Sequence, residues 1–283
     1  QAQLFVLAAG YYPFRMDCTE FGISPARYPY ASVGYVAMET KQLPSARLYV
    51  LREGIHGLIA NYGSSQGHEH ESLVADLLLA ETTEINAWLR DQGIDHAFRP
   101  FLTWDRGYWK QKRFQELDRL GWGWSIPFKK RTFIGVQVEL LDFPRPPETP
   151  LEIYVWASKS ETPWRRIVGR LTSNSDQQWD VLTNDWRLNP GTVLQLQQER
   201  WQIEPLFQWL KQQTTFKQPV GKSWMHWITH CLLLTLLHLV LVYYLLLLGF
   251  PRWQSHLTRL CQDLRYSDPN PWPPFYVRGE KRF

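Results

Sequence analysis

Cysteine is scarce in this chain, and the few cysteines that occur are far apart. The 283 residues contain Cys18, Cys231 and Cys261 and no Cys-x-x-Cys pair. This odd number and wide spacing argue against a disulfide framework and against a zinc module, and they favour a reducing, cytoplasmic compartment. The sequence also lacks an initiator methionine, a basic signal-peptide start and a transit-peptide pattern, which is compatible with a fragment of a longer protein.

An excess of charge of one sign is missing as well. The 31 Lys and Arg residues against 27 Asp and Glu give a net charge of +4, which is compatible with a polyanionic partner and does not identify one. Hydrophobic residues make up 44% of the chain, enough for a sizeable core. Fifteen tryptophans could stack on bases or sugars, but the frequency of aromatic residues in cores favours packing.

Charged residues are absent from positions 223 to 250, a run long enough to span a bilayer. Because the run is apolar on all sides, it is either a helix buried in the protein or a membrane span. His226, His230 and His238 lie in it without nearby carboxylates, so we interpret them as core or interfacial residues rather than metal ligands. His68 and His70 also lack a third ligand at a suitable spacing, and a solvated helix start explains them better.

The hydrophobic pattern predicts alternating strands and helices. Strands are expected at 11–21, 31–38 and 46–51, followed by a helix at 69–92. A short buried strand at 100–104 ends at Asp105 and leads into a helix at 109–120. Further strands are expected at 123–128, 132–141, 151–157, 165–171 and 180–183, and an amphipathic helix at 190–213.

Three charged side chains are expected on one face of the last of these helices. At 100° per residue, Arg200, Glu204 and Lys211 fall within about 40° of each other. Geometry alone favours a surface helix with an ion pair between Arg200 and Glu204. The same face could instead aim one carboxylate and two cations along the edge of a sheet.

The amino-acid sequence of this segment resembles a known signature. Insertion-sequence transposases of the DDE type carry Tyr-x2-Arg-x3-Glu-x6-Lys, which is similar to this chain at Arg200, Glu204 and Lys211, with Gln197 in place of the tyrosine. Leu182-Thr-Asn184 also resembles the strand before that helix.

The two aspartates of the family have counterparts upstream. Asp105-Arg-Gly-Tyr108, followed by a helix and Leu120-Gly121, resembles the block that carries the second catalytic aspartate. For the first aspartate, the best candidate is Asp17 in Met16-Asp-Cys-Thr19. In all, the resemblance covers about residues 12 to 245.

The resemblance implies an α/β fold: a ribonuclease-H-like mixed five-stranded sheet flanked by helices, with a β-rich insertion before the last catalytic helix. Asp17 would lie on the first strand, Asp105 on the fourth and Glu204 on the helix. The expected organisation is a first part of the catalytic domain at 1–131, the insertion at 132–178, the last strand, catalytic helix and apolar helix of the same domain at 179–250, and a C-terminal tail at 251–283. An apolar helix often follows the glutamate-bearing one in this family, which favours burial of 223–250 over a membrane span.

The implied activity is metal-dependent cleavage and strand transfer of DNA. Asp17, Asp105 and Glu204 would be catalytic and would bind two Mg²⁺ or Mn²⁺ ions, since these ions prefer oxygen ligands. Arg200 and Lys211 would contact DNA phosphates. The family's tyrosine belongs to the DNA-contacting part of the helix, so Gln197 is a departure that bears on DNA affinity. Transposon ends and target DNA are the expected partners, a homodimer is expected by analogy, and the expected location is the cytoplasm at the nucleoid.

Two rival hypotheses remain. One is a truncated, inactive transposase-derived protein that binds DNA, which the near-terminal position of Asp17 and the change at Gln197 suggest. The other is a membrane-anchored protein with a nuclease-like soluble part, which depends on 223–250. Close approach of the carboxylates would favour the enzyme.

Overall fold

The computed structural model describes residues 2–22, 33–36, 41–66, 71–93, 99–129, 135–139, 150–157, 162–171, 177–213 and 223–249. These residues divide into two compact units, and the division falls between Ile203 and Glu204. The first unit contains the sheet. The second contains helices α5 (Glu204–Gln213) and α6 (Trp224–Leu247). The predicted tail at 251–283 and the histidine pair at 68 and 70 lie outside the described residues.

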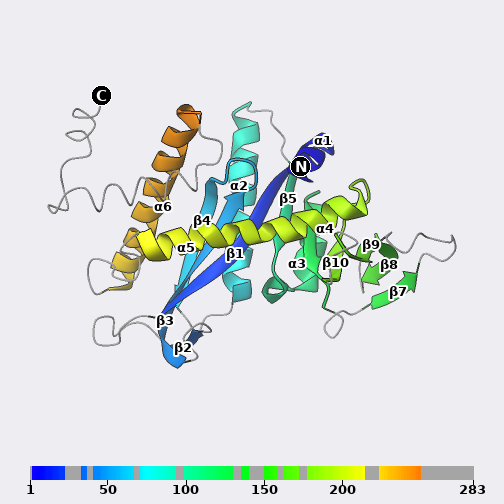
Figure 1. Cartoon of the computed structure of the whole chain (residues 1–283), viewed down its shortest axis with the longest axis horizontal. Coiled ribbons are helices and arrows are strands. Elements are labelled where there is room, and N and C mark those ends of the chain that lie inside the picture. Colours follow the sequence, from blue (N-terminus) through cyan, green and yellow to red (C-terminus); the bar gives the residue numbers. More distant parts are fainter. Residues whose placement is uncertain are drawn as a thin grey trace. The chain divides into compact units, whose positions relative to one another are not determined.

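Ten strands of the described residues form one mixed, mostly antiparallel sheet (Figure 1). Their order is β2-β3-β1-β5-β6-β10-β9-β8-β7, and β4 also pairs with β3. The β1–β5 and β5–β6 pairs are parallel, whereas the other pairs are antiparallel. The strands are β1 (Tyr11–Gly22), β2 (Val33–Val36), β3 (Lys41–Glu53), β4 (Ile59–Gln66), β5 (Arg99–Trp104), β6 (Gly123–Pro127), β7 (Gly135–Glu139), β8 (Leu151–Ala157), β9 (Trp164–Gly169) and β10 (Trp179–Thr183).

Helices cover both faces of the sheet in the first unit. On one face, α2 (Glu71–Asp91) and α3 (Gln111–Arg119) enclose a core that includes Leu102 and Trp104 of β5. On the other face, α1 (Ala2–Ala8) and α4 (Pro190–Glu199) enclose a core that includes Phe101. Successive residues of β5 thus point to opposite faces, as the pleat of a strand requires.

Short-range patterns predicted several of these elements well. The predicted strand at 100–104 and helix at 69–92 correspond to β5 and α2, and the predicted helix at 109–120 contains α3 preceded by a 3-10 turn, η1 (Arg106–Tyr108). Strands β7, β8 and β9 fall within 132–178, where a β-rich insertion was predicted.

Strand β4 and helix α1 have no counterpart in the sequence prediction. Strand β4 lies beside β3 and has only Ile59 and Ser65 buried, so its sequence shows no apolar alternation. Position 63 of this strand nevertheless requires glycine, because a Cβ there would lie 2.9 Å from a Val74 methyl carbon of α2. In α1, Ala2 and Val6 are buried one helical turn apart, a pattern of only two residues.

The prediction of one continuous helix over 190–213 is wrong. The α-helix α4 ends at Glu199, residues Arg200–Ile203 form a 3-10 turn, η3, and α5 begins at Glu204. Pro205 explains the interruption, because it has no N–H for the Trp201 carbonyl and its ring clashes with that oxygen. The common face calculated for Arg200, Glu204 and Lys211 assumed uniform α-helical rotation, so it does not apply.

Helix α6 is the apolar run that the sequence left open. Its 24 residues have a mean hydropathy of 2.2 over the most apolar window, and 39% of that window is buried. By length and composition it could cross a membrane, a property that the core helix of a soluble protein can share. Trp227, Cys231, Val242 and Leu245 are buried, and Leu233, Leu236 and Tyr243 are exposed.

Candidate functional site

Two aspartates stand side by side where the parallel pairing of two strands ends. Strands β1 and β5 pair in register up to Met16 and Trp104, and the next residue along each chain is an aspartate, Asp17 and Asp105. Asp17 lies within β1 and its residue is only 8% exposed, whereas Asp105 follows β5 and half of its side chain is exposed. The end of this parallel pairing thus brings together two residues that are 88 positions apart in the sequence.

Arg200 lies between these two carboxylates. Its Nη1 donates a hydrogen bond to Asp17 Oδ2, and its Nη2 is 3.6 Å from Asp105 Oδ1. The Arg200 side chain is 6% exposed, and its guanidinium also lies 5.1 Å from the Trp201 ring centre. Two carboxylates that share one guanidinium supply oxygen atoms of the kind that divalent metal ions prefer, while the guanidinium balances part of their negative charge. The resemblance implies that Arg200 contacts DNA phosphates, and no sequence pattern indicated this inward contact.

Glu204 and Lys211 belong to the second unit. Glu204 is the first residue of α5, where its negative charge interacts favourably with the positive end of the helix dipole. Lys211 lies in the last turn of the same helix. Along the chain, Glu204 follows Arg200 by four residues. Within the described ranges, no group of three or more His, Cys, Asp or Glu side chains is placed so that it could hold a metal ion.

Helix α4 and turn η3 are fixed to strands β1 and β3 by buried arginines. Arg15 of β1 pairs with Glu199 at 3.2 Å, and its side chain is 3% exposed. Arg52 of β3 donates to the Gln202 carbonyl of η3 and, at 3.0 Å, to the Gly57 carbonyl. Burial lowers the pKa of Arg52 to about 10, so it stays charged at neutral pH. These arginines hold the turn that carries Arg200, and sequence spacing gave no sign of their partners.

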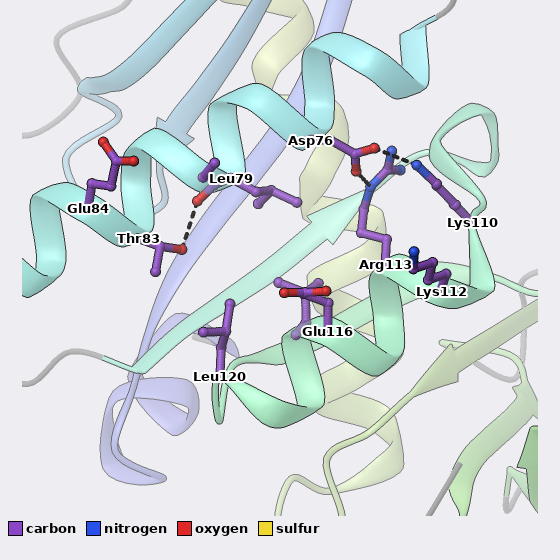
Figure 2. A pocket seen from close by; sticks show the side chains of 11 residues that line it. Asp76, Leu79, Thr83, Glu84, Lys110, Lys112, Arg113, Glu116 and Leu120 are labelled. Carbon is purple, nitrogen blue, oxygen red and sulfur yellow. Dashed lines mark hydrogen bonds and ion pairs between the residues drawn. The ribbon is translucent and has the colours of Figure 1, made fainter. Parts of the chain in front are cut away.

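The residues after Asp105 are held from the other face of the sheet. Arg113 of α3 donates to the Tyr108 carbonyl of η1 at 2.6 Å, and its guanidinium lies 5.6 Å from the Trp104 ring centre. The same guanidinium pairs with Asp76 of α2 at 2.6 Å, and Lys110 pairs with Asp76 at 2.5 Å. Figure 2 shows the Asp76 carboxylate facing both of these cations, and the three residues line a cavity of about 480 Å³ between α2 and α3. Asp76 thereby joins α2 to the segment next to Asp105.

Replacing Asp76 by asparagine should destabilise the protein in a pH-dependent way. Partial burial opposes ionisation of Asp76, but hydrogen bonds and charges from Arg113 and Lys110 outweigh it and lower the pKa of the carboxyl. A lowered folded-state pKa contributes stability above the unfolded value of about 3.9 that is lost as pH falls through the folded pKa. Because the side chain is 38% exposed, we expect Asp76→Asn to cost about 1 kcal/mol at pH 7.

Urea unfolding of both proteins between pH 3 and 7 measures this difference. The gap should shrink as pH falls below about 4. Glu116→Gln is the control, since Glu116 is an exposed acid that lines the same cavity. A gap that is constant with pH would contradict the ion-pair explanation.

The chain is similar to a known protein family over more than half of its length. Residues 52–218 match the family described as "Transposase DDE domain". This range includes Asp105, Arg200, Glu204 and Lys211, whereas Asp17 precedes it. The search of curated proteins gave no match.

Among solved structures, the piggyBac transposase in a synaptic complex with hairpin DNA is similar to this chain, with a TM-score of 0.47 and 11% sequence identity. The similarity covers 95% of this chain and 56% of that protein. This chain therefore spans little more than half the length of that relative.

Proposed function

Because the chain belongs to the transposase DDE domain family, we propose that it is a DNA transposase whose carboxylates Asp17, Asp105 and Glu204 carry out strand cleavage and strand transfer. The observation that carries the proposal is the pairing of Asp17 and Asp105 around one guanidinium. Two neighbouring carboxylates repel each other unless a cation lies close to both, so such pairs are typical of sites that bind cations. The family supports the nuclease class of the enzyme, and the aspartate pair supports the position of its site.

The central strands support the finer assignment of a ribonuclease-H-like sheet. In the order β4-β3-β1-β5-β6, the first three strands are antiparallel neighbours and the last two run parallel to β1. We assign these five strands to the catalytic sheet and β7, β8 and β9 to the insertion at 132–178. Residues 179–250 would then return to the catalytic domain with α4, η3, α5 and α6.

The residues of the site would have different roles in the reaction. Asp17, Asp105 and Glu204 would hold Mg²⁺ or Mn²⁺, which would activate a water or a 3′-hydroxyl and stabilise the leaving oxygen of the cleaved phosphodiester. Arg200 and Lys211 would bind DNA phosphates. The DNA partner would comprise element ends and target, a homodimer would hold the two ends, and the protein would act in the cytoplasm at the nucleoid.

Metal-dependent nicking of supercoiled DNA by the purified chain tests this function. We expect nicking with Mg²⁺ or Mn²⁺, none with chelator, and loss of nicking in Asp105→Ala and Glu204→Ala. Glu116→Ala, an exposed acid on α3, should keep wild-type nicking.

Two outcomes would contradict the proposal. A folded wild-type chain that binds DNA without cutting it would favour the inactive DNA-binding hypothesis instead. Nicking that persists in both variants would remove these carboxylates from the site.

A further inference from the structure

Gln197 is a buried amide on α4 whose two ends are both hydrogen-bonded. The residue is 1% exposed. Its Nε2 donates to the main-chain carbonyl of Trp104 at 2.9 Å, and its Oε1 accepts from the Ser125 hydroxyl at 3.3 Å. Trp104 ends β5, and Ser125 lies on β6, the next strand. A single side chain of α4 therefore joins the helix to the end of β5 and to the middle of β6.

The carbonyl that Gln197 binds belongs to the residue immediately before Asp105. On the other side of Asp105, its own carbonyl accepts a hydrogen bond from the Tyr108 N–H at 3.1 Å. The main chain is thus held on both sides of this aspartate. Although Asp105 is the N-cap residue of η1, its carboxylate makes no capping hydrogen bond. The carboxylate is therefore aimed by its main chain and is not engaged in closing the turn.

We propose that Gln197 is a positioning residue that fixes the orientation of Asp105 through the Trp104 carbonyl. This inference rests on the proposed function, because it assigns Asp105 to the metal site. The resemblance implies that the family's tyrosine at this position contacts DNA, whereas the Gln197 side chain is buried between α4 and the sheet. Gln197 is also three residues before Arg200 in the sequence. The same helical segment therefore holds the main chain next to Asp105 and carries the guanidinium that faces the Asp105 carboxylate.

The expected effect of losing this amide is on metal affinity. Hydrogen bonds that orient metal ligands typically change affinity or activity by about 10-fold to 100-fold when they are removed. Gln197→Met has a similar volume and is unbranched, but it can neither donate to Trp104 nor accept from Ser125. Without this donor to the Trp104 carbonyl, the peptide before Asp105 is held less firmly, which weakens a site that needs fixed oxygen positions.

Mn²⁺ binding to the full chain, measured by electron paramagnetic resonance without DNA, tests this role. We expect Gln197→Met to weaken the affinity about 10-fold or more, at a melting temperature that still indicates a folded chain. Gln198→Met is the matched control, because Gln198 is the next residue of α4 and is exposed; its affinity should stay within about 2-fold of wild type. In nicking assays, Gln197→Met should need about 10-fold more Mn²⁺ for the half-maximal rate and leave the KM for DNA unchanged.

Ser125→Ala provides a second variant, since it removes one partner of the amide and keeps the Trp104 bond. It should weaken Mn²⁺ binding about 3-fold, and it keeps the test decisive if Gln197→Met does not fold. Wild-type affinity in every variant that folds would overturn the proposal, provided that Asp105→Asn does weaken binding. If Asp105→Asn itself binds Mn²⁺ like wild type, the metal site of the proposed function is wrong and the role of Gln197 falls with it.

Discussion

Replacing Asp17 by asparagine should lower metal-dependent nicking by about 1,000-fold, equivalent to about 4 kcal/mol of transition-state stabilisation. The same change should also lower the free energy of unfolding by about 3 kcal/mol. The reason is that Arg200 would lose the partner of a buried ion pair, in which the side chains are 6% and 12% exposed. Asp105 would still face the guanidinium, at 3.6 Å, so the loss of stability should be partial rather than complete unfolding.

A second substitution separates these two effects of Asp17→Asn. In the double variant with Arg200→Gln, no buried guanidinium lacks its partner, so most of the lost stability should return. Nicking should not return, because the metal-binding carboxylate is still missing. Urea unfolding and plasmid nicking of the wild type, both single variants and the double variant provide the measurement.

Asp180→Asn serves as the control for the loss of one carboxylate. Asp180 pairs with Arg166 at 2.8 Å and is 34% exposed, so its loss should cost little stability and no nicking. Retention of nicking by folded Asp17→Asn would remove Asp17 from the catalytic site. Recovery of nicking along with stability in the double variant would mean that Asp17 serves only to neutralise the buried Arg200 guanidinium and does not hold the metal.

Replacing Phe114 by alanine should lower the free energy of unfolding by about 3–5 kcal/mol, the range for a large aromatic side chain removed from a core. Phe114 is fully buried on α3, and its ring centre lies 4.6 Å from that of Trp124. It also contacts Trp104, Trp109 and Trp164, at centre distances of 5.7, 5.4 and 6.0 Å. These four tryptophan rings belong to four different segments. They cannot all move in to fill the cavity left by the phenyl ring unless the strands of the sheet also move.

Urea unfolding followed by tryptophan fluorescence measures this change. Phe5→Ala is the matched control, since Phe5 is 53% exposed on α1 and should change the free energy of unfolding by less than about 0.5 kcal/mol. A loss below about 1 kcal/mol in Phe114→Ala would mean that the aromatic cluster is not the stabilising core of this unit.

The tryptophans illustrate what composition could and could not predict. Their number left base stacking and core packing both open, and the burial of Trp104, Trp124, Trp164 and Trp227 favours packing for these four. Two of their indoles depend on Asp118, which accepts from Trp124 Nε1 at 2.9 Å and from Trp164 Nε1 at 2.6 Å. Burial raises the pKa of this carboxyl even though the hydrogen bonds oppose the shift. A lone aspartate on a polar helix gave no sequence sign of this role.

Local patterns placed Asp105 correctly at the end of a strand, because a buried apolar run followed by a helix is a signal contained within about twenty residues. The partners of Arg200 could not be predicted in the same way. Its contacts to Asp17 and Asp105 depend on the pairing of β1 with β5 and on a 3-10 turn that Pro205 imposes. Helical spacing specifies which side chains share a face, but not which distant strand the face meets.

The pairing of β1 with β5 sets different tolerances for insertions in different parts of the chain. Added residues between β6 and β10 lengthen a branch of the sheet and leave positions 17 and 105 opposite each other. One residue added or removed within β1, between Tyr11 and Asp17, would instead turn the Asp17 side chain to the opposite face, away from Arg200. Natural or engineered length variation should therefore accumulate in the former region and be excluded from the latter.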